Sequence, residues 1–345
     1  MALLDALLES GRVPDAVTRV GIRRLLRERL REEEGRPDPA AHKRRLIAEW
    51  SRSPLVVAPR AANDQHYEVP VDFFRLVLGP RLKYSSGLWP KPDTTLAESE
   101  EAMLSLSIER AGLADGQRIL ELGCGWGSLT LAMAERFPGA RIDAISNSST
   151  QKVWIDSECA RRGIRNVRIE TADIATFSPD ERFDRVVSVE MFEHVRNHQA
   201  LLRRIAGWLL PGGRLFVHVF AHRRHAYLYE DQGPTDWMAR HFFTGGMMPS
   251  NDLLSRCDST LTQVFMWTHS GLHYSRTSEA WLANLDARRD DVHEVFRSAY
   301  GPGQERRWIA RWRTFFLSCA ELFRFGAGEE WGVTHYLFEK PENLG

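Results

Sequence analysis

Two carboxylates and an imidazole stand close together in the middle of the chain, at Glu190, Glu193 and His194. Their spacings of i, i+3 and i+4 predict that all three lie on one face of a helical turn. A carboxylate beside an imidazole can hold a cationic ligand and accept its proton. Acids that complement a helix dipole remain an alternative. A metal site is disfavoured because the chain lacks a second Glu/His motif, so we expect no metal.

The trio must be positioned by the elements around it, and the first of these is a short apolar strand at 186–189. Further strands are expected at 119–123, 141–146, 167–171 and 215–220, with helices between them. This alternation predicts an α/β fold with a parallel, doubly wound sheet and right-handed crossovers. Such a sheet binds ligands at its carboxyl edge, where the trio would lie. Two more strands are expected, at 263–268 and 331–339.

A glycine-rich turn follows the strand at 119–123 and precedes a predicted helix at 128–136. Gly123, Gly125 and Gly127 let the backbone approach a ligand, and the helix amides would point at it. The G-x-G-x-G spacing differs from the G-x-G-x-x-G of dinucleotide sites, and Trp126 leaves little room for a pyrophosphate. The next strand ends in Asn147 instead of an acid. A G-x-x-x-x-G-K-[ST] sequence is absent, which excludes a P-loop.

The flanking segments predict a cap and a lid. Residues 2–50 have helical periodicity that Pro14 and the stretch 35–39 divide into two or three helices. A helix is expected at 96–111, and helices are expected between 278 and 325. Residues 221–250 are rich in His, aromatic side chains and glycine, and we interpret them as a lid. The predicted parts are thus 1–112, 113–220 and 221–345.

The composition excludes several classes of partner. The 345 residues are 43% hydrophobic, and 46 basic residues balance 46 acidic ones, so no global field attracts nucleic acid or an anionic membrane. No run approaches a membrane span, so stable membrane anchoring is not expected. The cysteines are far apart and favour a reducing cytoplasm. A homodimer is allowed. The cysteines are Cys124, Cys159, Cys257 and Cys319.

Motifs along nearly the whole chain resemble S-adenosylmethionine-dependent methyltransferases of the cyclopropane fatty acid synthase superfamily, and most of all the coclaurine-type N-methyltransferases. The motifs that carry the resemblance include 63–70, 82–85, 121–127, 146–151, 172–174, 190–195, 242–246, 273–278, 312–316 and 328–331. The resemblance implies a class I Rossmann-like fold with a seven-stranded, mostly parallel sheet and helices on both faces. It also implies a helical N-terminal extension and a C-terminal lid insertion.

The resemblance implies S-adenosylmethionine as cofactor and places its contacts. A carboxylate after the third strand can accept from the exocyclic amine of adenine while an apolar neighbour packs on the ring. For the carboxylate, Asp173, a helix N-cap is the alternative role. The implied contacts are Tyr84 and Ser85 near the methionine moiety, Gly123 and Gly125 through backbone, Asn147 and Gln151 at the ribose, Asp173 and Ile174 at the adenine, and backbone near Val189.

Methyl transfer is an in-line displacement that requires alignment, desolvation and a nucleophile with a free lone pair. An amine arrives protonated at neutral pH. The resemblance therefore implies that Glu193 and His194 hold the ammonium and accept its proton, with Glu190 supporting them. The expected substrate is a small, aromatic or isoquinoline-like amine. Its expected contacts are Tyr67, Glu68, Phe242, Tyr274 and Trp331, because aromatic faces attract a cation.

Two alternatives remain at this point. The first is methylation or cyclopropanation of a lipid acyl chain, in which bicarbonate quenches a carbocation. Of the bicarbonate-binding positions of those synthases, the chain keeps Glu193, His218 and Tyr274. It has Ser86 in place of cysteine, Phe220 in place of isoleucine and Glu190 in place of glycine, which favours the amine. The second alternative is a non-catalytic cofactor-binding partner protein, against which the complete Glu190, Glu193 and His194 set argues.

Overall fold

The computed structural model describes residues 3–57, 69–233, 235–257 and 259–342. Its strands are β1 (Arg118–Leu122), β2 (Arg141–Ser146), β3 (Val167–Thr171), β4 (Phe183–Val189), β5 (Leu209–His222), β6 (Tyr227–Leu228), β7 (Met247–Met248), β8 (Thr262–His269) and β9 (Trp331–Glu339). Its α-helices are α1 (Leu3–Glu9), α2 (Asp15–Glu34), α3 (Pro39–Trp50), α5 (Val71–Val77), α6 (Leu96–Ala111), α7 (Ser128–Arg136), α8 (Ser149–Arg162), α9 (His198–Trp208), α10 (Trp237–His241), α11 (Gly271–Ala287), α12 (Arg289–Tyr300) and α13 (Glu305–Arg324).

The main sheet has seven strands in the order β3-β2-β1-β4-β5-β9-β8. The first five are parallel, whereas β9 is antiparallel to both β5 and β8. β4 pairs with both β1 and β5, so the residues that follow β4 emerge in the middle of the carboxyl edge. The predicted α/β fold with a mostly parallel seven-stranded sheet is confirmed.

Helix ends are set by local side chains. Thr95 and Glu98 form a reciprocal capping box at the start of α6, and Gly112 ends that helix in the left-handed conformation. Ser148 caps α8 by accepting from the backbone N–H of Gln151. The Ser148 cap starts α8 immediately after β2, so the turn between β2 and α8 lies at the carboxyl edge of the sheet.

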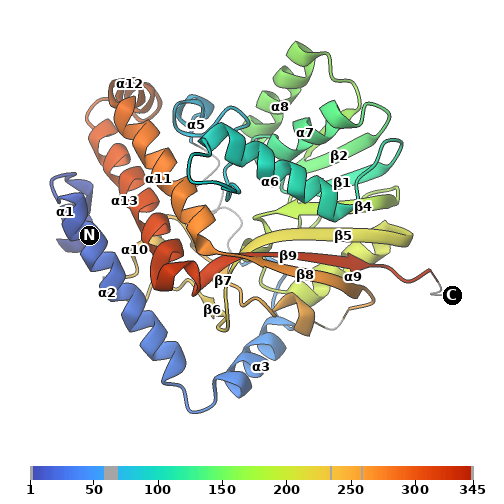
Figure 1. Ribbon diagram of the computed structural model, residues 1–345, viewed down its shortest axis with the longest axis horizontal. Coiled ribbons are helices and arrows are strands. Elements are labelled where there is room, and N and C mark those ends of the chain that lie inside the picture. Colours follow the sequence, from blue (N-terminus) through green and yellow to red (C-terminus); the bar gives the residue numbers. More distant parts are fainter. Residues whose placement is uncertain (1–2, 58–68, 234, 258, 343–345) are drawn as a thin grey trace.

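The molecule has a second, helical layer at one end of the sheet (Figure 1). There α11, α12 and α13 pack around an aromatic core that also includes Phe73, Phe74 and Trp126. The N-terminal helix α2 lies alongside α13, where Arg19 and Arg23 pair with the buried Glu321. Separate apolar cores cover the two faces of the sheet. The N-terminal helices therefore pack on helices that lie between β8 and β9 in the sequence.

Three predicted boundaries are wrong. β4 begins at Phe183 instead of Val186. β5 begins at Leu209, because Leu209 pairs with Phe183 ahead of the turn at 211–213. α11 begins at Gly271 instead of near Ser278, because the Ser270 side chain accepts from the backbone N–H of Leu272 and caps the helix there. The division into 1–112, 113–220 and 221–345 stays a prediction. Among the described residues, no helix is long and apolar enough to cross a membrane.

Candidate active site

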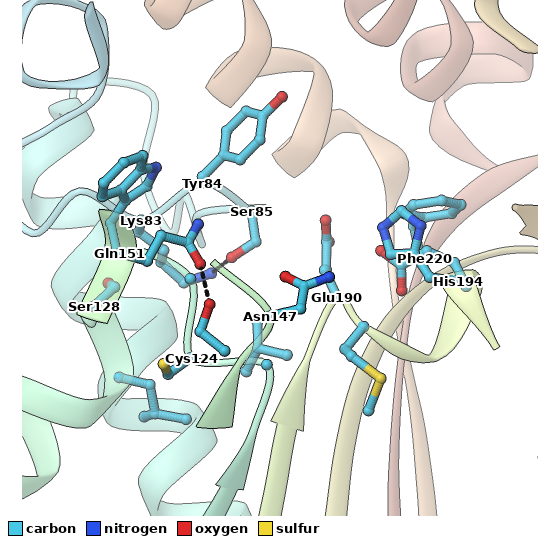
Figure 2. Close-up of a pocket in the computed structure, with 18 of the residues that line it drawn as sticks. Lys83, Tyr84, Ser85, Cys124, Ser128, Asn147, Gln151, Glu190, His194 and Phe220 are labelled. Carbon is cyan, nitrogen blue, oxygen red and sulfur yellow. Dashed lines mark hydrogen bonds between the residues drawn. The ribbon is translucent and has the colours of Figure 1, made fainter. Parts of the chain in front are cut away.

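A cavity lies over the carboxyl edge of the sheet, between the strand ends and the helical layer. Loops after β1, β2, β3 and β4 form its floor, and α11, α13 and the segment 229–243 form its roof. Figure 2 shows Gln151 and Ser85 toward one end, His194 and Phe220 toward the other, and Asn147 and Glu190 between them. The roof residues are Tyr229, Met238, Phe243, Tyr274, Trp281, Phe315, Cys319, Leu322 and Phe323.

The glycine turn after β1 forms one wall of this cavity. Gly123, Gly125 and Gly127 have φ values of 78°, 52° and 82°, a region that favours glycine. A Cβ on Gly123 would lie 2.9 Å from the side chain of Met191, and one on Gly127 would lie 2.8 Å from Ile155. A Cβ on Gly125 would meet nothing within 4 Å, so the backbone is bare toward the cavity. The turn thus leaves room for a ligand.

The predicted ribose contacts lie next to this turn. Gln151 is buried, and its Oε1 accepts from the Ser146 hydroxyl at 2.6 Å, which orients the amide. Asn147 lines the same wall. Asp173 also lines the cavity, and its Oδ1 accepts from the backbone N–H of Ala175 at 2.8 Å. This contact caps a turn, and no helix begins there, so the alternative role as a helix N-cap is wrong.

The remaining predicted cofactor contacts, Tyr84, Ser85, Ile174 and Val189, also line the cavity. Tyr84 extends from the helical side, where its ring lies 5.6 Å from that of Trp281. Ser85 is buried, and its hydroxyl accepts from the ammonium of Lys83. The structure therefore brings every predicted cofactor residue to one cavity, although their individual roles stay predictions.

Glu190, Glu193 and His194 reach the cavity by a different backbone path from the predicted one. Only 192–194 form a helical turn, and it is a 3-10 turn, whereas Glu190 lies outside it with a left-handed φ of 49°. A non-glycine residue in this region costs about 1 kcal/mol. All three side chains nevertheless line the cavity. The expected convergence is present, but a single helix face does not produce it.

The two carboxyl groups are buried and lie in an electrostatically unusual setting. Burial raises the pKa of Glu190 to about 7, although a hydrogen bond from Tyr274 and the charge of Lys83 oppose the shift. Burial, with the nearby Glu190 charge, raises the pKa of Glu193 well above its usual range. The Tyr274 hydroxyl donates to Glu190 Oε2 at 2.5 Å, and Glu193 Oε2 is buried without a hydrogen-bond partner in the described chain. A cation in the cavity would satisfy both groups.

The predicted substrate contacts divide into three cases. Tyr274 lines the cavity. Phe242 and Trp331 do not: Phe242 stacks on Phe315 in the aromatic core, and the Trp331 indole donates to the Tyr227 hydroxyl at 3.0 Å. Contact of those two residues with the substrate stays a prediction. Other aromatic residues line the cavity, among them Phe243, whose ring lies nearly parallel to that of His194. Tyr67 and Glu68 lie outside the described residues.

Two buried charged residues of the cavity were given no role from the sequence. Lys83 donates to Ser85 and to the Ser86 carbonyl, and burial lowers its pKa to about 8. Glu121 accepts from the Thr130 hydroxyl at 2.5 Å, and burial raises its pKa to about 7. Both residues lie within motifs that carry the family resemblance, 82–85 and 121–127. For Glu121, a charged residue within an otherwise apolar strand at 119–122 could have indicated a role at the site.

Comparison with known proteins places this cavity in a family. Residues 58–331 match the family described as mycolic acid cyclopropane synthetase. The chain belongs to the mycolic acid cyclopropane synthetase family. The match spans the glycine turn, the Glu190 to His194 segment and both roof helices. Within the described residues, no cluster of three or more His, Cys, Asp or Glu side chains that could hold a metal was found.

Relatives of this synthetase-family chain include plant N-methyltransferases. It is 37% identical to (S)-coclaurine N-methyltransferase of Thalictrum flavum subsp. glaucum over 339 residues, 96% of this chain and 94% of that protein. It is 36% identical to pavine N-methyltransferase of the same plant, over 79% of this chain and 78% of that protein. A crystal structure of coclaurine N-methyltransferase bound to N-methylheliamine and SAH superimposes with a TM-score of 0.94 at 37% identity, covering 98% of this chain and 99% of that one.

Proposed function

We propose that this protein transfers the methyl group of S-adenosylmethionine to the nitrogen of a small isoquinoline-type amine. The chain is an S-adenosylmethionine-dependent methyltransferase of its family, and its similarity to coclaurine and pavine N-methyltransferases supports the amine. The observation that carries the proposal is the pair of carboxyl groups of Glu193, which is buried, and Glu190, whose side chain is 8% exposed, both facing a cavity with aromatic walls. An ammonium ion matches both the charge and the aromatic faces.

The cofactor site fits the residues present, because bare backbone at Gly125 faces the cavity beside oriented polar groups. When bound, S-adenosylmethionine supplies an electrophilic methyl group on a sulfonium. We propose that Asn147 and Gln151 hold its ribose, and that Asp173 and Ile174 hold its adenine. Tyr84, Ser85 and the backbone at Gly123 and Val189 complete the proposed set.

The protein residues have separate tasks in the proposed reaction. Burial of Glu193 disfavours its charged form, so this carboxylate is a good acceptor for a proton from the amine. Glu190, held by Tyr274, stays beside it and attracts the cation. His194 supports proton removal, and the roof excludes water, which leaves the nitrogen lone pair free for in-line attack. In balance, one proton would move from the ammonium to Glu193, and the methyl would form a bond to nitrogen as its bond to sulfur breaks, which would leave SAH.

Glu190 also provides a reason to prefer the amine over a lipid acyl chain. The synthases implied by the sequence resemblance hold bicarbonate with residues matching Glu193, His218 and Tyr274, and have glycine at position 190. Here the Glu190 carboxylate is 2.5 Å from the Tyr274 hydroxyl and 3.3 Å from His218 Nε2. A carboxylate thus already lies between these two groups, and a bicarbonate anion beside it would be repelled.

The acceptor class is tested with labelled S-adenosylmethionine and separate panels of tetrahydroisoquinolines, phenethylamines and unsaturated phospholipids. We expect label on the nitrogen of tetrahydroisoquinolines. Label that enters only the phospholipids would contradict the proposal, and binding of the cofactor without transfer to any panel would favour a non-catalytic partner protein.

We also propose a cytoplasmic location, which the four free cysteines support. The homodimer that the sequence allows stays a prediction, and sedimentation equilibrium would check it.

A further inference from the structure

A line of polar side chains leaves the active site on the far side of Glu190 and runs through the sheet. Glu190 Oε1 lies 3.3 Å from His218 Nε2. His218 Nδ1 lies 2.8 Å from His335 Nε2, and His335 Nδ1 lies 2.8 Å from Nη1 of Arg110. The same Arg110 nitrogen lies 2.6 Å from His269 Nε2. The proposed reaction uses Glu190 but leaves the other four residues without a role.

Strand register and helix packing bring these residues together. His218 on β5 is directly opposite His335 on β9 in the antiparallel ladder. His269 ends β8, the neighbour of β9, and Arg110 stands in the last turn of α6. His218 and His335 are completely buried, whereas Arg110 and His269 are half-buried. The line therefore connects the cavity to a site near the surface.

The arginine determines which ring nitrogens carry hydrogen. A guanidinium is always protonated and only donates, so His335 Nδ1 must accept. A ring with an accepting Nδ1 is neutral and carries its hydrogen on Nε2, and this hydrogen points to His218 Nδ1. By the same rule, His218 carries its hydrogen on Nε2, which lies 3.3 Å from Glu190 Oε1; both atoms are buried, and neither has a hydrogen-bond partner among the described residues. The single donor Arg110 thus determines which ring nitrogen carries the hydrogen in both His335 and His218.

We propose that Arg110 is a positioning residue that fixes His335 and His218 as Nε2–H tautomers and so places a polar hydrogen, instead of a lone pair, beside the Glu190 carboxylate. Glu190 Oε2 then accepts from the Tyr274 hydroxyl, and the hydrogen-bearing Nε2 of His218 lies 3.3 Å from Oε1, close enough for electrostatic attraction although the two atoms do not form a hydrogen bond. The opposite His218 tautomer would aim a lone pair at the carboxylate and repel it. This arrangement favours the anionic form of Glu190, against the effect of its burial, so that Glu190 attracts the substrate cation and leaves the proton to Glu193.

The line of polar side chains from Glu190 to Arg110, here called the Arg110 array, is not a route for protons to leave the site. A proton could leave Glu190 by this path only if His218 Nε2 could accept it, but Nε2 already carries a hydrogen. The outer end is an arginine, which does not give up its proton. Burial, together with the charge of Arg110 and of Lys83, holds the pKa of both His218 and His335 well below the usual range. Three further charged or titratable groups lie near the Arg110 end of the array: Glu109, His269 and His273.

The tautomers can be measured directly by ¹⁵N NMR of the full-length protein labelled at histidine. We expect His218 and His335 to show a protonated Nε2 and an unprotonated Nδ1 from pH 6 to pH 9, with the signals assigned by His335→Gln and His218→Gln. In Arg110→Met the two tautomers of His335 should mix and those of His218 should follow. Arg110→Lys, which keeps a cationic donor, should restore the wild-type pattern.

Kinetics test the consequence for catalysis, which rests on the proposed function. We expect kcat for amine methylation to fall about 10- to 100-fold in Arg110→Met, with SAH affinity unchanged, because a polar hydrogen beside the Glu190 carboxylate is replaced by a lone pair in part of the molecules. Arg276→Met is the matched control: Arg276 also stacks on a tryptophan, Trp89, but contacts backbone carbonyls instead of this array.

The two parts can fail separately. A wild-type His218 that carries hydrogen on Nδ1, or an Arg110→Met variant with unchanged tautomers, would overturn the inference, and the wild-type spectrum requires no variant to fold. The expected tautomers in a protein that methylates no amine would support the tautomer assignment and contradict the proposed function.

Discussion

The two ends of the cavity are built in different ways. At the proposed cofactor end, Gly123, Gly125 and Asn147 lie in two consecutive strand-to-helix turns, and Gln151 lies in the first turn of α8. The backbone conformation of the glycine turn shapes this end. At the substrate end, Glu190 is set by Tyr274 and His218, which are distant in sequence. The first end is a local feature of the chain, and the second is a property of the assembled fold. Substitutions should therefore separate cofactor affinity from turnover.

The largest expected effect is at the substrate end. Glu193→Gln keeps the shape of the side chain but removes the proposed proton acceptor, so kcat should fall about 10³-fold. SAH affinity, measured by calorimetry, should stay within about twofold because the contacts at the cofactor end are unchanged. The control is Glu170→Gln, which changes an exposed carboxylate on β3. A parallel loss of turnover and affinity would erase the distinction between the two ends.

A backbone substitution should give the opposite pattern. Gly123→Ala forces a Cβ into a left-handed position and against Met191, so we expect SAH affinity to fall about 10- to 100-fold and stability by ~1 kcal/mol. Gly163→Ala is a matched control, because Gly163 has a φ of 70° at the end of α8 but open space around it. It should lose stability and keep affinity. Unchanged SAH binding in Gly123→Ala would contradict the proposed role of the glycine turn in binding the cofactor.

Glu121 sharpens the comparison because it places a titrating charge at the cofactor end. Its pKa is raised by burial to about 7, so between pH 4.5 and pH 7 the folded state binds more protons than the unfolded state. Stability should therefore fall as pH rises through this window. Glu121→Gln removes this loss, which we expect to be about 1–3 kcal/mol. Denaturation of the ligand-free protein at pH 5 and pH 8 checks it, and identical pH profiles for both proteins would contradict it.

The smallest expected effect concerns an aromatic wall. Phe220 lines the cavity, and its ring meets that of Phe243 edge to face at 5.8 Å. Phe220→Ile should raise KM for the amine about 3- to 10-fold through loss of an aromatic face for the cation, with cofactor affinity unchanged. Steady-state kinetics with a tetrahydroisoquinoline measure it. A lower KM for the amine would show that this wall does not attract the cation.

The same contrast explains what could be predicted from the sequence. The strands around the glycine turn could be predicted because strand and helix patterns alternate along this part of the chain. Asn147 and Gln151 could be placed at the carboxyl edge of the sheet because they closely follow β2. Phe242 and Phe243 are neighbours beyond the end of α10, where neither helical nor strand periodicity decides which one faces the cavity. Trp331 has the character of a cation-binding aromatic, but its register opposite His222 places it in the core. The Arg110 array requires the pairing of strands 117 residues apart, which no local pattern encodes.

The central claim is tested most directly by single-turnover methyl transfer to a tetrahydroisoquinoline across a pH series, with wild type and Glu193→Gln both saturated with cofactor. We predict that the variant is slow at neutral pH and recovers toward the wild-type rate at alkaline pH, where the free amine already has its lone pair. A variant that transfers methyl at the wild-type rate at every pH would contradict the assignment of Glu193 as the group that deprotonates the substrate.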